Sequence, residues 1–164
     1  MSKGTNLIFN ATPHFVKERR IDIQNSTFKI GLISDPVTSL LVSETDPGFG
    51  DGNINEVAAG GNYTAGGQTL TLANVSASSV FTMKLDTGTH SGGTISWAQD
   101  GSNPTNAKTA VIYDSSVVSA LAICYYDITD DGGTTAIDMQ GRDLEVNIGA
   151  AGNAGEILKL STSN

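Results

Sequence analysis

The residues best spaced for chemistry in this 164-residue chain form an acidic stretch toward its C-terminal end. Asp127, Thr129, Asp131 and Asp138 occupy positions one, three, five and twelve of a calcium-binding loop, and Gly132 occupies position six. Two features argue against calcium: position twelve is Asp, which reaches less far than Glu, and the preceding segment reads as a strand rather than a helix. We therefore favour an acidic turn between two strands and expect no metal site, with Asp127, Asp131 and Asp138 as the only ligand candidates.

Nucleophiles and general bases are scarce in the rest of the chain. The only histidines are His14 and His90, and neither has metal-ligand spacing to another histidine or to the single cysteine, Cys124. Cys124 lies in an apolar run, which is typical of a small core residue. We therefore predict that the protein is not an enzyme, with no catalytic residue and no cofactor.

The charge balance narrows the classes of partner. The formal net charge is −8 and the sequence pI is near 4.4, so the surface repels phosphate backbones, and we expect neither nucleic acid nor membrane as a partner. Three of the nine basic residues, Lys17, Arg19 and Arg20, are nevertheless clustered, which predicts a docking site for an acidic surface. No N-terminal apolar stretch qualifies as a secretory signal, so synthesis in the cytoplasm is expected.

The elements that must position these residues are predicted to be strands. Only 16% of the residues are charged and 19 are glycine, which is typical of an all-β, turn-rich domain. We predict one antiparallel β-sandwich or barrel-like domain of about nine strands over residues 21–164, after an N-terminal arm or short helix over residues 1–20. The strand candidates are 21–23, 27–33, 69–72, 80–85, 94–98, 109–113, 120–126, 135–139, 143–148 and 156–160.

Two local predictions are more specific. Segments 94–98 and 109–113 flank a polar turn, so we interpret them as the central hairpin, with Trp97 on its buried face. Residues 10–20 are the best helix candidate, with Thr12 as the N-cap and Pro13 at the first helical position. Residues 35–62 are mostly loop and are predicted to be functional or ordered by a partner. Phe49 in this loop and Tyr63 just after it are the aromatic contact candidates.

Several of these segments together resemble one known group of proteins. In order they are Thr-Phe-Lys-Ile-Gly-Leu at 27–32, Asn-Glu-Val at 55–57, Gly-Asn-Tyr-Thr-Ala-Gly-Gly-Gln-Thr-Leu at 61–70, the Trp97 strand, and Ala-Val-Ile-Tyr-Asp at 110–114. This order is similar to that of small virion proteins of tailed bacteriophages, over roughly residues 20–128. Two features depart from the group: Gly-Gly-Asn-Tyr at 60–63 replaces the commoner Gly-Thr-Gly-Tyr, and the loop 82–94 is longer.

The resemblance implies a structural, non-enzymatic component of the virion. The expectation is a capsid decoration (cement) protein on the phage head that binds the major capsid protein or another virion protein, as a trimer or a lattice-bound monomer. The expected contacts are Lys17, Arg19, Arg20, Phe49 and Tyr63. Two alternatives stay open: a tail-tube, head-completion or neck ring component, and a carbohydrate-binding adhesin module, which would need exposed aromatics.

Overall fold

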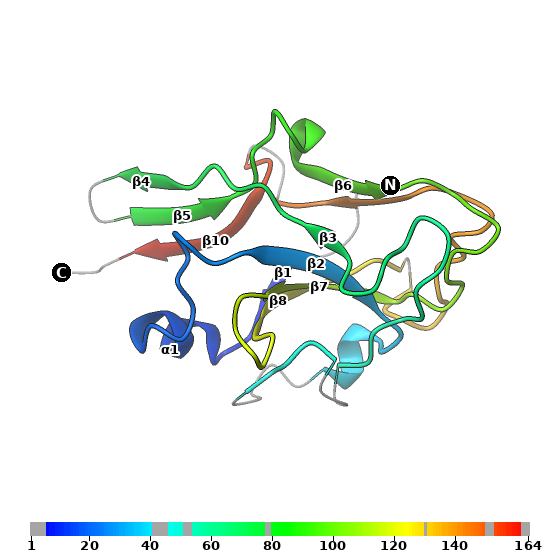
Figure 1. Cartoon of the computed structure of the whole chain (residues 1–164), viewed down its shortest axis with the longest axis horizontal. Helices are drawn as coiled ribbons and strands as arrows, with labels where there is room; N and C mark the ends of the chain where they lie inside the picture. The colour runs from blue at the N-terminus through cyan, green and yellow to red at the C-terminus, as the bar shows by residue number, and fades with distance from the viewer. Residues whose placement is uncertain are drawn as a thin grey trace.

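A computed structural model describes residues 6–40, 46–50, 54–77, 80–129, 131–149 and 153–161. Its largest sheet is antiparallel throughout and has the order β1-β8-β7-β2-β3 (Figure 1). The strands are β1 (Asn6–Ile8), β8 (Ala122–Asp127), β7 (Thr109–Asp114), β2 (Phe28–Ile33) and β3 (Gln68–Thr69). The predicted all-β class is therefore confirmed.

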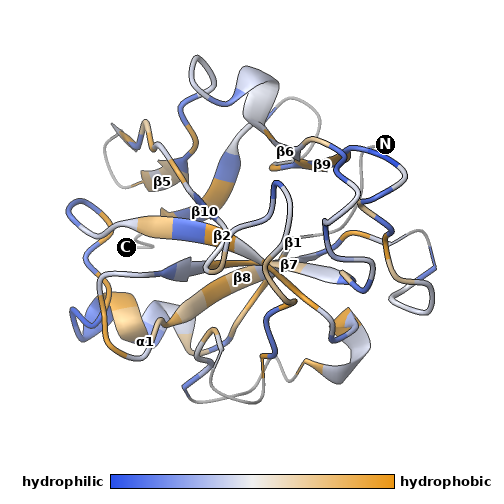
Figure 2. Ribbon diagram, turned by 45° about the vertical axis from the view of Figure 1, so that its right-hand side comes forward, coloured by the Kyte–Doolittle hydropathy of each residue, from blue (hydrophilic) through white to orange (hydrophobic). Residues whose placement is uncertain are grey.

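Two smaller antiparallel sheets form the second layer of a sandwich. One has the order β10-β5-β4, and the other pairs β6 with β9. Both lie on the same side of the large sheet, next to each other, in the two ribbon views (Figures 1 and 2). Their strands are β4 (Val75–Ala77), β5 (Val80–Lys84), β6 (Thr94–Trp97), β9 (Leu144–Asn147) and β10 (Glu156–Ser161).

Both faces of the large sheet are covered. One face packs against the smaller sheets in the main core, through side chains that include Phe28, Ile30, Ile112, Met83 and Trp97. The other face packs against the connection that follows β2, in a second cluster that includes Phe9, Ile33, Leu40, Ile54, Val111 and Tyr125. Strand β7 is buried along its whole length, which confirms the prediction that its nearly unbroken apolar run is covered on both sides.

Helical structure in the described residues is limited to short pieces. These are α1 (Thr12–Lys17) and the single-turn 3₁₀ helices η1 (Val37–Ser39) and η2 (Ser91–Gly93). The N-terminal segment is part of the core, because β1 pairs with β8 and Phe9 is fully buried. No helix in the described part of the chain is long and apolar enough to cross a membrane.

The predicted hairpin is wrong. Strand β6 carries Trp97 on its buried face as expected, but it pairs with β9, whereas β7 pairs with β2 and β8. The polar turn therefore carries the chain from one layer of the sandwich to the other. In that turn Asn103 is buried, and its amide donates to the carbonyls of Ala98 and Met139 at 2.8 and 3.0 Å.

Other local predictions also need correction. Residues 21–23 form a bend and turn rather than a strand, and 135–139 contribute only an isolated bridge between Ile137 and Ala107. Thr12 is the first residue of α1 and not its N-cap, because its hydroxyl donates to the Ile123 carbonyl at 2.8 Å. Strands β1 and β4 were not predicted, because each has only three residues.

Candidate functional site

Three of the five segments that carry the resemblance meet in one hydrogen-bonded group, the Glu56 node, formed by Glu56, Tyr63, Gly66 and Tyr113. Glu56 forms an isolated bridge to Ile33 at the end of β2. Its carboxylate oxygen Oε1 accepts from the Tyr63 hydroxyl at 2.8 Å and from the Gly66 N–H at 2.5 Å. The Tyr113 hydroxyl then donates to the Gly66 carbonyl at 2.7 Å. One carboxylate thus links the loop at 60–67 to the large sheet.

The node also extends the edge of the large sheet. The backbone ladder between β2 and β3 involves only Lys29 and Ile30. Beyond it, the Leu32 N–H donates to the Tyr63 hydroxyl at 2.9 Å, and the Leu32 carbonyl accepts from the Val57 N–H at 3.0 Å. A buried side chain here takes the place of a missing strand, so no backbone group of Leu32 is left unpaired.

The electrostatics of the node keep its two tyrosine hydroxyls protonated near neutral pH. Burial raises the pKa of Tyr63 far above its usual value, and the charge of Glu56 raises it further. Burial and the same charge raise the pKa of Tyr113 to about 12. Both phenols therefore stay protonated donors, and the node has the chemistry of a structural clamp rather than a general base.

Two glycines let the loops approach the sheet closely around the node. Gly67 has φ +67° and lies directly on the backbone of Ile30 and Gly31, which leaves no room for a Cβ. On the other side, the Phe49 ring covers Gly31, and it stacks on Tyr113 with ring centroids 4.3 Å apart and an interplanar angle of 4°. The part of the turn-rich connection that carries Phe49 is therefore packed against the large sheet of the same chain.

The two aromatic contact candidates differ in how far they are buried. Tyr63 is 1% exposed and so is not a surface contact, and Phe49 is half-buried on Gly31 and Tyr113. The predicted burial of Trp97 is confirmed: it is 2% exposed, and its ring lies 6.2 Å from that of Tyr63. The adhesin alternative thereby loses Trp97, its best residue for stacking on a sugar.

The acidic stretch does not assemble as a calcium loop. Asp127 accepts from the N–H and hydroxyl of Thr129, Asp131 accepts from the Thr135 N–H, and Asp138 accepts from the Gln140 N–H. Each carboxylate thus caps its own turn. Asp130 lies outside the described residues, and among those that are described no three His, Cys, Asp or Glu side chains could together hold a metal.

The histidines and the cysteine lie apart from the node. His14 is within 3.6 Å of Glu18 on the exposed side of α1, and Nε2 of His90 accepts from the Thr71 N–H at 3.0 Å. Cys124 is fully buried, and burial raises the pKa of its thiol to about 12. Among the described residues, none of the three belongs to a group of His, Cys, Asp and Glu side chains that could hold a metal.

The basic cluster is exposed at the C-terminal end of α1, but its members differ. Arg20 is already engaged, since its guanidinium contacts Asp46 at 2.6 Å and lies 4.8 Å from the centre of the Phe15 ring. Lys17 and Arg19 make no ion pair with any other described residue. Within the described part of the chain, Lys17 and Arg19 are thus the two predicted cationic contacts that hold no ion pair.

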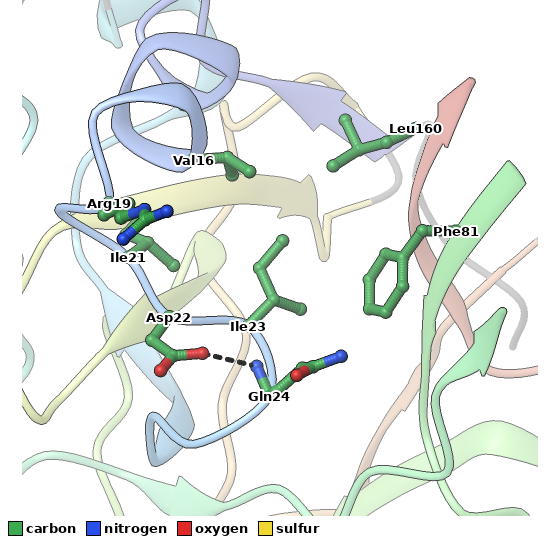
Figure 3. A pocket seen from close by; sticks show the side chains of 8 residues that line it. All are labelled: Val16, Arg19, Ile21, Asp22, Ile23, Gln24, Phe81 and Leu160. Atoms are coloured by element: carbon green, nitrogen blue, oxygen red, sulfur yellow. Dashed lines mark hydrogen bonds between the residues drawn. The ribbon is translucent and has the colours of Figure 1, made fainter. Parts of the chain in front are cut away.

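Arg19 stands at the rim of a groove of about 520 Å³ between α1 and the sheet β10-β5-β4 (Figure 3). The lining residues are Val16, Arg19, Ile21, Asp22, Ile23, Gln24, Phe81 and Leu160. Of these residues, only Arg19 was predicted from the sequence as a partner contact, because the lining comes from segments far apart in the chain. The alternation of Ile21 and Ile23 was a usable signal, but it was interpreted as a strand.

We expect the Glu56 node to contribute measurably to stability. Glu56→Ala removes a charged acceptor from two donors, one of them buried, and should lower the free energy of unfolding by about 3 kcal/mol. Glu56→Gln keeps an acceptor oxygen and should cost about 1 kcal/mol. Urea denaturation checks both, with the exposed Glu145→Ala on β9 as control, expected within about 0.5 kcal/mol of wild type. Equal effects of Glu56→Ala and Glu145→Ala would contradict the role assigned to the node.

Comparison with known proteins adds no relative. No family model, no curated protein and no solved structure matches the chain.

Proposed function

We propose that this chain is a structural component of a tailed-bacteriophage virion, and specifically a decoration protein that binds the outside of the head. The observation that carries the proposal is the convergence of the resembling segments on the Glu56 node. Three of the five segments, 55–57, 61–70 and 110–114, meet there through direct hydrogen bonds in one clamp, although Gly66 and Tyr113 are 47 positions apart in the sequence. Such an arrangement favours a shared scaffold rather than chance similarity of short motifs.

The chemistry of the described residues supports a binding rather than a catalytic role. The tyrosines of the node are locked as neutral donors, and the acidic side chains of the 127–138 stretch cap their own turns. The acidic net charge suits a protein that must stay soluble before it assembles. The exposed cations at the end of α1 provide a local surface of opposite sign, which is where we place the contact with the major capsid protein.

The proposed mechanism is stabilisation by mass action. A protein that binds only the assembled lattice stabilises it by an amount that grows with its free concentration relative to its dissociation constant. Contacts that bridge neighbouring capsid subunits would therefore raise the resistance of the shell to internal pressure. The symmetry of the binding site on the capsid would determine whether the protein binds there as a trimer or as separate monomers.

Electron cryomicroscopy of the particle whose genome encodes the chain tests the proposal. Density for the β-sandwich on the outer head lattice is the expected result. Density confined to the tail or neck would keep the virion role and replace decoration with the ring or tube alternative. Absence of the chain from purified particles, checked by mass spectrometry, would overturn the virion role itself.

The cationic contact has its own test. Lys17→Ala with Arg19→Ala should lower head occupancy about tenfold at limiting protein, because both charges are available to an acidic lattice surface. Arg20 is left in place because its contacts with Asp46 and Phe15 belong to the fold. Lys108→Ala with Arg142→Ala removes the same charge elsewhere and serves as the control. Equal occupancy for the two double variants would refute the assigned contact.

A further inference from the structure

Helix α1 ends in a backbone conformation that arginine does not favour. The Arg20 N–H donates to the Phe15 carbonyl at 2.8 Å, and the Arg19 N–H donates to the Val16 carbonyl at 3.2 Å. These two bonds form a Schellman motif, whose left-handed position is usually glycine. Here that position is Arg19, with φ +56°, so the fold carries a strained residue where glycine would be relaxed. The side chain of Arg19 is the feature that glycine could not supply.

The charge of Arg19 is not used within the described residues. Asp22 is the acidic residue that lines the groove together with Arg19, and its carboxylate is hydrogen-bonded within its own turn. The Asp22 carboxylate accepts from the Gln24 N–H at 3.0 Å and from the Asn25 side-chain amide at 2.7 Å. These bonds lower the pKa of Asp22, so it stays charged in that turn. Among the described residues, no carboxylate forms an ion pair with the Arg19 guanidinium at the rim of the groove.

The groove beside Arg19 is apolar and partly open. Val16, Phe81 and Leu160 are half-buried, and Figure 3 shows their side chains and that of Ile23 pointing toward one another across the gap. The walls come from α1, from the turn at 21–24, and from the paired strands β5 and β10, in which Phe81 is opposite Leu160. A volume of about 520 Å³ falls within the range of binding pockets, and apolar lining with few polar groups is typical of them.

We propose that this groove binds an extended segment of a partner protein in which an acidic side chain lies next to one or two large apolar side chains. The apolar side chains would pack between Val16, Ile23, Phe81 and Leu160, and the carboxylate would pair with the Arg19 guanidinium. A carboxylate matches the planar fork of arginine through two parallel hydrogen bonds, so one acidic residue suffices. Nucleic acid is disfavoured as the occupant because the chain has a net charge of −8.

This inference deepens the proposed function by naming the chemistry of the partner segment, but its test does not need a virion. The probe is the acetylated and amidated tetrapeptide Glu-Leu-Asp-Ile, titrated into the ¹⁵N-labelled full chain and followed by NMR. Saturable shifts of the amides at 16–24, 80–82 and 158–161 are expected, with a dissociation constant of about 1 mM. The peptide Lys-Leu-Lys-Ile should give no saturable shift there.

Arg19→Gly separates binding from folding. Glycine suits the left-handed position, so the melting temperature should be unchanged or higher, while the dissociation constant for the acidic peptide should rise about fivefold. Arg142→Ala, an exposed arginine elsewhere, should leave the affinity unchanged. Wild-type affinity in Arg19→Gly, equal binding of the two peptides, or no localised shift at all would overturn the inference. None of these results bears on whether the chain is present in the virion.

Discussion

Gly67→Ala is expected to be among the most damaging single substitutions in the chain, lowering the free energy of unfolding by about 4 kcal/mol. Two costs combine. Gly67 has φ +67°, which costs an L-residue about 1 kcal/mol, and an added Cβ would overlap the Ile30 carbonyl oxygen and lie 2.7 Å from the Gly31 Cα. Because both obstacles are backbone atoms of β2, the loop at 60–67 must move and strain the Glu56 node. Urea denaturation should show a midpoint about 2 M lower.

Gly50→Ala is the matched control for that experiment. Gly50 has φ +83°, but a Cβ there would meet no atom within 4 Å. It should therefore show the cost of the backbone conformation alone, about 1 kcal/mol. The difference in free energy of unfolding between the two variants measures how much the close approach of the loop to β2 contributes to the loss. Similar losses of unfolding free energy in Gly67→Ala and Gly50→Ala would mean that the packing of Gly67 on Ile30 contributes little to the cost of Gly67→Ala.

The sequence predicted elements well where a local pattern decides them. The alternation of apolar residues located β2, β5, β6 and β9, and the unbroken apolar run of β7 correctly indicated burial on both faces. Trp97 was correctly placed in the core because only one face of its strand is apolar. These features depend on residues one or two positions apart, so they can be predicted without knowing which strands pair.

Pairing and accessibility depend on distant residues, and there the prediction failed. Strand β6 pairs with β9, which begins 47 residues after Trp97 at Leu144, because the turn after β6 changes layers instead of closing a hairpin. Tyr63 looked like an exposed loop aromatic, but Glu56 and the Leu32 N–H satisfy its hydroxyl inside the molecule. No local pattern identifies such a partner, so burial of a polar aromatic could not be predicted.

The groove escaped prediction for the same reason. Its apolar walls join α1 and the following turn to β5 and β10, and none of these segments is unusual alone. Besides the alternation of Ile21 and Ile23, the local signal was a conflict: a helix end whose left-handed position holds arginine instead of glycine. Such a conflict becomes visible only when the end of the helix is known to within one residue.

Alkaline pH is expected to unfold the protein in one cooperative step above pH 10. Burial raises the pKa of Tyr113 and of the Cys124 thiol to about 12, and raises those of Tyr63, Tyr125 and Tyr126 as well. In the unfolded chain the phenols ionise near pH 10 and the thiol near pH 8.5. Above those values the unfolded state binds fewer protons than the folded state, so stability falls as pH rises.

The size of the effect follows from the number of buried phenols. Each group that is protonated only in the folded state lowers the free energy of unfolding by about 1.4 kcal/mol per pH unit. Tyr63, Tyr113 and Tyr126 together give roughly 4 kcal/mol per pH unit at pH values that lie between their unfolded-state and folded-state pKa values, which is a large fraction of the stability of a typical domain. Phenolate absorbance and Trp97 fluorescence should therefore change at the same pH, whereas in guanidinium-unfolded protein the phenols should titrate near pH 10. Gradual phenolate formation near pH 10 with unchanged Trp97 fluorescence would show that these hydroxyls reach water in the folded protein, and would contradict the closed Glu56 node.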